Sequence, residues 1–178
     1  MSKKIVIVDY GMGNLRSVVN AFEHLGADVM LSSRPQDLET AQAVVVPGQG
    51  AFRDCLINLK RQRLTEALER QVIQKRKLYL GICLGMQVLG TKSFEGGKHK
   101  GLNWVVGEVK LLQPKNKLCK IPHLGWNDVK ITKAHSLFTG LSDTPCFYFA
   151  HSYVLYPKSS DVVTAVTDYG GELPVALA

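Results

Sequence analysis

A cysteine set between two glycines is the residue of this chain best suited to covalent chemistry. The segment at residues 81–87, Gly-Ile-Cys-Leu-Gly-Met-Gln, follows a short apolar run and precedes a helix-like stretch. A nucleophile at a sharp strand-to-helix turn needs small residues two positions before and after it, here Gly81 and Gly85. We therefore predict that Cys83 is a nucleophile at a helix N-terminus, where the dipole favours the thiolate and the Leu84 N–H helps to hold an oxyanion. The plainer alternative is a buried cysteine that only fills space.

A second segment could stabilise negative charge. Residues 47–50, Pro-Gly-Gln-Gly, end another apolar run, and their glycines allow turns that offer backbone N–H groups to an anion. Because the carboxyl ends of parallel strands share one crevice, we expect this loop to face Cys83. The backbone of Gly48, Gln49 and Gly50 would then supply a second oxyanion donor, although an ordinary strand-to-helix turn has the same composition.

Gly11-x-Gly13, after the first apolar run, resembles part of a dinucleotide-binding fingerprint. The third glycine of that pattern falls at Arg16, whose side chain would obstruct the approach of a pyrophosphate. We predict a tight loop beside the same pocket rather than a nucleotide site.

The first half of the chain alternates strand-like and helix-like segments, which is typical of a parallel sheet covered by helices. Strands are expected at residues 4–9, 29–32, 43–46 and 78–80, and helices at 15–25, within 52–60 and around 64–73. Gly26 is placed to end the first helix. The last helix should carry Leu64, Leu68, Val72 and Ile73 on one side.

After about residue 96 the chain becomes rich in β-branched and aromatic residues. Antiparallel strands are expected at residues 104–112, 128–132, 147–155 and 161–167, added to the same sheet or covering it. The fold class predicted is α/β, with a mixed, mainly parallel central sheet, helices on both faces and antiparallel strands in the C-terminal half. We expect a single domain over residues 1–178.

Composition narrows the functional classes. The chain has 178 residues, 46% hydrophobic and 21% charged, and its apolar runs are too short to cross a bilayer. With no signal-peptide pattern and no Cys-x-x-Cys, we expect a cytoplasmic location, free thiols and no metal site. The net charge of +7 comes largely from residues 60–63 and 70–77, which look like a solvated helix face rather than a nucleic-acid site. That face could instead meet an acidic protein or a phosphorylated substrate.

Four segments together resemble a known family. Residues 81–87 are similar to the nucleophile motif of the class I (triad-type) glutamine amidotransferases, and residues 47–50 to their oxyanion loop. Residues 10–14 (Tyr-Gly-Met-Gly-Asn), 120–127 (Lys-Ile-Pro-His-Leu-Gly-Trp-Asn) and 148–153 (Tyr-Phe-Ala-His-Ser-Tyr) resemble the subgroup of glutaminase subunits of imidazole glycerol phosphate synthases. The likeness runs from residue 4 to about 175.

The resemblance implies a reaction and a partner. Cys83 would attack the glutamine amide, release ammonia and form a glutamyl thioester that water hydrolyses. Gln87, His151, Ser152 and Tyr153 would hold the substrate, without a cofactor. Ammonia would pass to a (β/α)8-barrel synthase subunit in a heterodimer of histidine biosynthesis, with Asn14, Trp126 and Asn127 at the interface.

Several of these residues have plainer explanations. Trp126 could be a core aromatic, and Asn127 a turn residue before the next strand. His151 could be a hydrogen-bonded strand histidine, and His123 a surface loop residue.

The chain departs from the family in one respect. The family's general base and its orienting carboxylate lie in a His-x-Glu motif near the C-terminus, and no histidine here stands two residues before a glutamate. We expect the natural product to continue past Ala178, and the 178-residue form to be weakly active or inactive.

Three other functions stay open. A related sugar-modifying synthase could use the same pair of subunits. A cysteine hydrolase of the α/β-hydrolase type shares the Gly-x-Cys-x-Gly pattern. A non-catalytic subunit that only binds the barrel would agree with the missing base.

Overall fold

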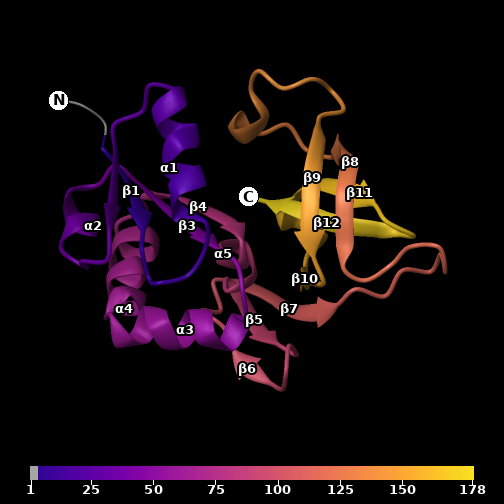
Figure 1. Ribbon diagram of the computed structural model, residues 1–178, viewed down its shortest axis with the longest axis horizontal. Helices are drawn as coiled ribbons and strands as arrows, with labels where there is room; N and C mark the ends of the chain where they lie inside the picture. Colours follow the sequence, from indigo (N-terminus) through magenta and orange to yellow (C-terminus); the bar gives the residue numbers. More distant parts are fainter. Residues whose placement is uncertain (1–3) are drawn as a thin grey trace. The chain divides into compact units, whose positions relative to one another are not determined.

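The computed structural model describes residues 4–178, which divide into two compact units (Figure 1). The first unit ends at Leu89, and the second begins at Gly90. The division falls just after the segment that carries Cys83.

The first unit is a four-stranded parallel sheet with strand order β2-β1-β3-β4. Its strands are β1 (Ile5–Val8), β2 (Val29–Ser32), β3 (Ala43–Gly48) and β4 (Leu78–Cys83). The helices are α1 (Leu15–His24), α2 (Asp37–Thr40), α3 (Phe52–Arg61), α4 (Leu64–Leu68) and α5 (Leu84–Gln87), with a π-helical segment, η1 (Glu69–Gln74), after α4. The alternation of strands and helices predicted for this half is confirmed.

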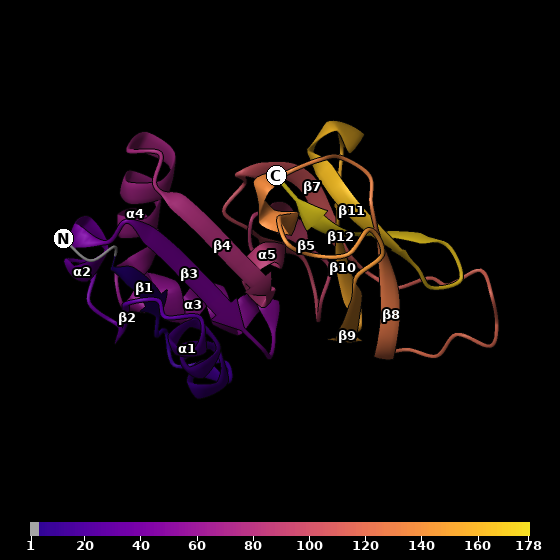
Figure 2. The ribbon, with the colours of Figure 1, turned by 90° about the horizontal axis from the view of Figure 1, so that it is seen from above.

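Both faces of this sheet are covered. Ile7 and Val45 pack on one face against Val19 of α1. The alternate residues Val44 and Val46 point to the opposite face and have no exposed surface. α1 and α4 lie on opposite sides of the sheet (Figure 2). The unbroken apolar runs therefore form strands buried on both sides.

The predicted apolar side of the helix around residues 64–73 is partly wrong. Leu64 and Leu68 are fully buried, but Ile73 is 45% exposed and Gln71 is buried in its place. The π-helical segment explains the change, because its wider turn shifts the residues that face the core by about one position.

The second unit contains two four-stranded sheets, with strand orders β10-β7-β5-β6 and β12-β11-β8-β9. Its strands are β5 (Gly90–Ser93), β6 (His99–Lys100), β7 (Val105–Leu111), β8 (His123–Ile131), β9 (Cys146–His151), β10 (Tyr153–Pro157), β11 (Val163–Asp168) and β12 (Glu172–Leu177), with 3-10 turns η2 (Ser136–Phe138) and η3 (Ser160–Val162). The predicted antiparallel strands are confirmed. They form sheets of their own, and the run predicted over residues 147–155 breaks at Ser152, where the chain passes from one sheet to the other.

A small apolar cluster joins these two sheets. Leu112, Val154 and Leu173 are buried together, and Tyr156 packs against them. Because β10 and β12 belong to different sheets, this cluster packs one sheet against the other.

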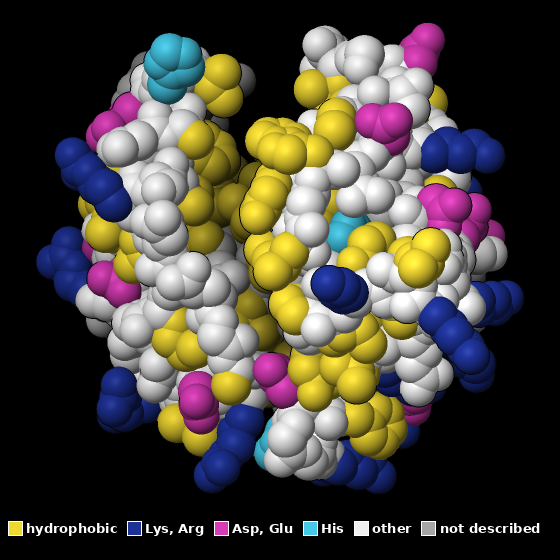
Figure 3. Space-filling model, turned by 45° about the vertical axis from the view of Figure 1, so that its right-hand side comes forward, with side chains coloured by type: hydrophobic (Ala, Val, Ile, Leu, Met, Phe, Trp, Pro, Cys, Tyr) yellow, Lys and Arg dark blue, Asp and Glu magenta, His cyan; other side chains and the backbone are white. Residues whose placement is uncertain are grey.

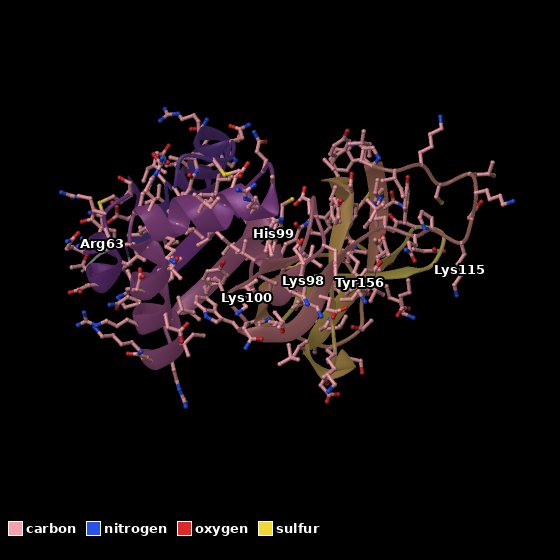
Figure 4. The ribbon with its side chains drawn as sticks, turned by 90° about the horizontal axis from the view of Figure 1, so that it is seen from below. Arg63, Lys98, His99, Lys100, Lys115 and Tyr156 are labelled. Atoms are coloured by element: carbon pink, nitrogen blue, oxygen red, sulfur yellow. The ribbon has the colours of Figure 1, made fainter. Side chains whose placement is uncertain are left out.

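The basic segments lie at the surface, as predicted. Arg61 and Arg63 are exposed, and Arg63 marks the turn between α3 and α4 (Figure 4). Among residues 4–178, none of the helices has the length and apolar character needed to cross a membrane.

Candidate active site

Cys83 lies at a strained turn between β4 and α5. Its backbone has φ 53° and ψ −108°, in the positive-φ region that non-glycine residues rarely occupy. Such strain persists only where the surrounding structure enforces it. The strand-to-helix turn predicted from residues 81–87 is therefore present in the structure.

The glycines beside Cys83 are required by close packing. A Cβ on Gly81 would lie 2.5 Å from the Gly85 carbonyl oxygen. A Cβ on Gly85 would overlap the carbonyl oxygen of Val46 in β3. Only glycine at both positions lets α5 pack this closely on the strands.

The thiol is less acidic than the sequence suggested. Desolvation of the sulfur, on a residue that is exposed as a whole, raises the pKa of Cys83 above its ordinary value, and the Leu84 N–H lowers it only in part. The Leu84 N–H at the start of α5 favours the thiolate, as expected, but desolvation outweighs it, and α5 has only 4 residues, so that its dipole is weak. A neutral thiol must give its proton to a base when it attacks.

The loop at residues 47–50 lies beside the elbow. Gly48 ends β3 and is the register partner of Cys83 in β4. A Cβ built on Gly48 would meet Leu84 Cβ at 3.0 Å, so Gly48 and Leu84 are in close contact. Gln49 is exposed, and Gly50 has φ +108°, which favours glycine. The structure thus brings the predicted oxyanion residues close to Leu84.

The glycine loop after β1 packs against Gly48. Gly13 has φ +101°, and a Cβ on it would lie 3.3 Å from Gly48 Cα. Asn14, predicted at the partner interface, is exposed and caps α1, because its Oδ1 accepts a hydrogen bond from the Ser17 N–H at 3.4 Å.

Two tyrosines that the sequence analysis did not select support the elbow and the loop. The Tyr10 hydroxyl donates to the Pro47 carbonyl at 2.8 Å, and the Tyr79 hydroxyl donates to the Gly85 carbonyl at 2.7 Å. Tyr10 is fully buried. The only sequence signal for Tyr10 is its position directly before the glycine loop that begins at Gly11.

Gln87 is buried in α5, on the protein side of the helix rather than at its surface. Among residues 4–178, no group of three or more His, Cys, Asp or Glu residues could hold a metal ion.

In the second unit, the segment predicted to hold substrate lies where β9 gives way to β10. His151 ends β9, Ser152 lies between the strands and Tyr153 begins β10. His151 Nδ1 is 3.1 Å from the Tyr153 carbonyl, and its Nε2 is 3.1 Å from His123 Nδ1. Desolvation lowers the pKa of His151 below its ordinary value; the hydrogen bond to the Tyr153 carbonyl opposes this shift, and His123 adds to it. His151 is therefore a hydrogen-bonded strand histidine.

His123 is not the surface loop residue that was considered. It is fully buried in β8 and stacks between Phe149 and Tyr169, with ring centroids 4.7 Å and 3.7 Å away. Its Nε2 lies 2.8 Å from Asn127 Oδ1. Asn127 is consequently a strand residue that holds His123, and not a turn residue.

Trp126 is not a core aromatic, because 72% of its surface is exposed. It lies opposite Tyr148 across β8 and β9, with ring centroids 5.6 Å apart, and Tyr148 is 57% exposed. Leu124, two residues earlier on the same face of β8, is 59% exposed. Large hydrophobic side chains are exposed at several places on the surface of the molecule (Figure 3).

A groove of about 790 Å³ lies elsewhere in the second unit, between the β8 and β11–β12 strands and the loop that contains Lys115 (Figure 4). It is lined by side chains of both charges, including Lys130, Asp128 and Glu172. None of the predicted site residues lines it.

Comparison with known proteins agrees with this geometry. The family model described as "Glutamine amidotransferase class-I" matches residues 6–177. A protein of Moorella thermoacetica named imidazole glycerol phosphate synthase subunit HisH is 42% identical over 98% of this chain and 81% of its own length. A Vibrio vulnificus protein named imidazole glycerol phosphate synthase subunit HisH 2 is also 42% identical, over 98% of this chain and 81% of its own.

Solved structures share the fold at low sequence identity. A crystal structure described as a glutamine amidotransferase has a TM-score of 0.72 at 18% identity, covering 96% of this chain and 82% of that one. A glutamine amidotransferase from Thermotoga maritima has a TM-score of 0.65 at 15% identity, covering 95% of this chain and 69% of that one. With the strained cysteine turn and the family match over nearly its whole length, the chain belongs to the class I glutamine amidotransferases.

Proposed function

We propose that the protein is the glutamine-hydrolysing subunit of an imidazole glycerol phosphate synthase. The observation that carries the proposal is the strained Cys83 backbone beside Gly48, its register partner on the neighbouring strand. The names of relatives about 40% identical to the chain support the choice of synthase.

The chemistry follows from the position of the thiol. Cys83 Sγ attacks the side-chain amide carbon of glutamine, and the resulting oxyanion lies between the Leu84 N–H and the backbone of residues 48–50. The tetrahedral intermediate then expels ammonia and leaves a thioester, which water hydrolyses to glutamate. Gln87 and the segment His151, Ser152 and Tyr153 hold the amino-acid end of the substrate.

The raised pKa of Cys83 makes a general base essential to this proposal. Residues 4–178 contain no histidine two positions before a glutamate, which is the pair that the family resemblance implies. A protein of residues 1–178 alone should therefore hydrolyse glutamine about 10⁴-fold or more slowly than a version extended by the His-x-Glu segment of a relative. Equal rates would refute this part of the proposal.

The ammonia passes to a barrel-shaped synthase subunit in a cytoplasmic heterodimer, and Asn14, Trp126 and Asn127 lie at that interface. The exposed Trp126 and Tyr148 pair favours a protein partner, because aromatic residues concentrate at the centres of interfaces. A second candidate is a subunit that binds the barrel without hydrolysing glutamine, which the same exposed aromatics would suit.

Ammonia release from glutamine, with and without the synthase subunit of a close relative, tests the proposal on the extended protein. Release should depend on Cys83, so Cys83→Ala should lose about 10⁴-fold or more in turnover. Cys146→Ala is the matched control, because Cys146 is also an exposed thiol. Tight binding of the barrel without ammonia release would instead support the second candidate.

A further inference from the structure

Two histidines of the second unit belong to one continuous chain of hydrogen-bonding groups. His151 Nδ1 is 3.1 Å from the Tyr153 carbonyl oxygen, and His151 Nε2 is 3.1 Å from His123 Nδ1. His123 Nε2 is 2.8 Å from Asn127 Oδ1, and Asn127 Nδ2 donates to the Asp168 carbonyl at 3.4 Å. Backbone carbonyls, which only accept hydrogen bonds, therefore stand at both ends of the chain.

This chain is one proton short when both histidines are neutral. The Tyr153 carbonyl requires a proton on His151 Nδ1, so the Nε2 of a neutral His151 can only accept. His123 must then donate from Nδ1, which leaves its Nε2 as an acceptor facing the Asn127 oxygen. Two acceptors 2.8 Å apart repel each other, and one further proton on the histidine pair turns their contact into a hydrogen bond.

The neutral pair can avoid this repulsion if the amide of Asn127 turns over. Asn127 Nδ2 then donates to His123 Nε2, and Asn127 Oδ1 faces the Asp168 carbonyl. The contact given up is the one that measures 3.4 Å, the longest of the four and therefore the weakest. The orientation of the Asn127 amide thus depends on the number of protons that the two histidines carry.

The surroundings of His123 can accommodate a positive charge. The ring is fully buried between the rings of Phe149 and Tyr169, whose centroids lie 4.7 Å and 3.7 Å from its own. The faces of aromatic rings attract a cation at such distances, which offsets part of the cost of burying the charge.

The ionisable side chains near the pair are engaged elsewhere. The Tyr169 hydroxyl donates to the Lys120 carbonyl at 2.8 Å, and Asp168 Oδ1 accepts from the Gly171 N–H at 3.0 Å. Tyr153 meets the pair through its carbonyl.

Two further ionisable residues belong to the same pair of strands. Asp128 and Tyr148 lie on the face of β8 and β9 opposite to His123 and Asn127, because side chains alternate along a strand. Desolvation lowers the pKa of His151, so we expect the additional proton to bind below about pH 6.5.

We propose that His123 and His151 form a proton-binding site, which takes up one shared proton and thereby turns the Asn127 amide so that it ties β8 to the end of β11. The shared proton can reside on either ring, because the proton between the rings can belong to His151 Nε2 or to His123 Nδ1. A second additional proton is opposed, since two N–H groups would then face each other across 3.1 Å. This inference goes beyond the proposed function and needs neither glutamine nor a partner.

The test is an NMR titration of the imidazole nitrogens in the 178-residue protein between about pH 8 and pH 5. We expect the two histidines to share one titration curve and to take up one proton together. The side-chain NH2 signals of Asn127 should shift with the same midpoint. His135 is the internal control, because it is exposed and its Nδ1 accepts from the Leu137 N–H, so its titration should leave the Asn127 signals unchanged.

Asn127→Asp tests the role of the amide. A carboxylate can only accept and carries a negative charge, so it should raise the midpoint of the pair by about 1 pH unit or more. Asn20→Asp is the matched control, since it places the same charge on an exposed position of α1 and should leave the midpoint unchanged.

Three results would overturn the inference. The first is uptake of two protons, one by each ring, and the second is no uptake by the pair down to about pH 5. The third is a set of Asn127 NH2 signals that stay constant while the rings titrate. These results come from the wild-type protein, so they decide the question even if Asn127→Asp does not fold. Absence of glutamine hydrolysis would remove the proposed function and leave this inference standing.

Discussion

The strained backbone at Cys83 does not make its thiol acidic. Desolvation raises the pKa of Cys83 above its ordinary value, which favours the neutral thiol over the thiolate. We therefore expect its nucleophilicity to depend on a general base that takes the thiol proton during the attack. This arrangement keeps the resting thiol unreactive toward other electrophiles.

This raised pKa predicts how alkylation depends on pH. The rate at which iodoacetamide modifies Cys83 in the substrate-free protein should still be rising at pH 9.0, because the thiolate is the reacting form and its fraction grows up to the pKa. Mass spectrometry of the peptide that contains Cys83 separates it from the exposed Cys146. A rate that levels off below pH 8 would contradict the raised pKa.

Gly85 should be the least replaceable glycine of the elbow. In Gly85→Ala the new Cβ overlaps the Val46 carbonyl oxygen, and both are backbone-fixed parts of α5 and β3. We expect a loss of about 3 kcal/mol in the free energy of unfolding, measured by urea denaturation.

Gly96→Ala provides the comparison for that variant. Gly96 has φ +61° with no atom within 4 Å of a built Cβ, so only the cost of a left-handed alanine applies, about 1 kcal/mol. If the two variants lost the same stability, packing at Gly85 would not be the reason for its glycine.

Residue types at the elbow were predictable because each requirement is local. Glycines two residues before and two residues after a cysteine indicate a sharp turn, and the structure confirms that turn. The raised pKa of Cys83 was not predictable, since it depends on how far the folded chain removes the sulfur from water. Tyr10 was missed for the same reason, because the carbonyl it holds lies 37 residues along the chain.

Among the elements, α1 begins at the loop that packs against Gly48. Asn14→Ala should lower the free energy of unfolding by about 0.5 kcal/mol, because it removes the side chain that caps the helix at a long 3.4 Å. Asn20→Ala, the same substitution within α1, should not destabilise the protein, since alanine is the better helix former. Urea denaturation of both variants is the measurement, and equal losses would contradict the cap.

Strand and helix positions in the first half were predictable because their apolar patterns are continuous. The η1 segment was not, because nothing in the pattern of residues 64–73 marks the wider turn that buries Gln71. The break at Ser152 was missed because residues 147–155 are apolar or aromatic on both sides of His151 and Ser152 and look like one strand. Which sheet each half joins depends on pairing with β8 and β7, far along the chain.

At the scale of the whole molecule, the exposed aromatic pair on β8 and β9 should bind the synthase subunit. Trp126→Ala should weaken binding about 10-fold or more, because a tryptophan buried at an interface commonly contributes over 1 kcal/mol. Its melting temperature should change little, since 72% of the side chain is exposed in this structure. Isothermal titration calorimetry with the synthase subunit is the measurement.

Leu118→Ala is the matched control for Trp126→Ala. Leu118 is 86% exposed and lies outside the strands, so its loss should leave the affinity unchanged. Equal weakening by both variants would mean that general surface hydrophobicity, rather than the aromatic pair, attracts the partner.

The pairing of Gly48 with Cys83 has a consequence for how chains of this fold can change in length. Hydrogen bonds between β3 and β4 set the spacing of these two residues, while the connection between them runs through α3, α4 and η1. Insertions in that connection leave the spacing intact, whereas losing one residue inside either strand would turn every later side chain to the other face. Homologues should therefore vary in the number of residues between the two strands and agree in the length of the strands themselves.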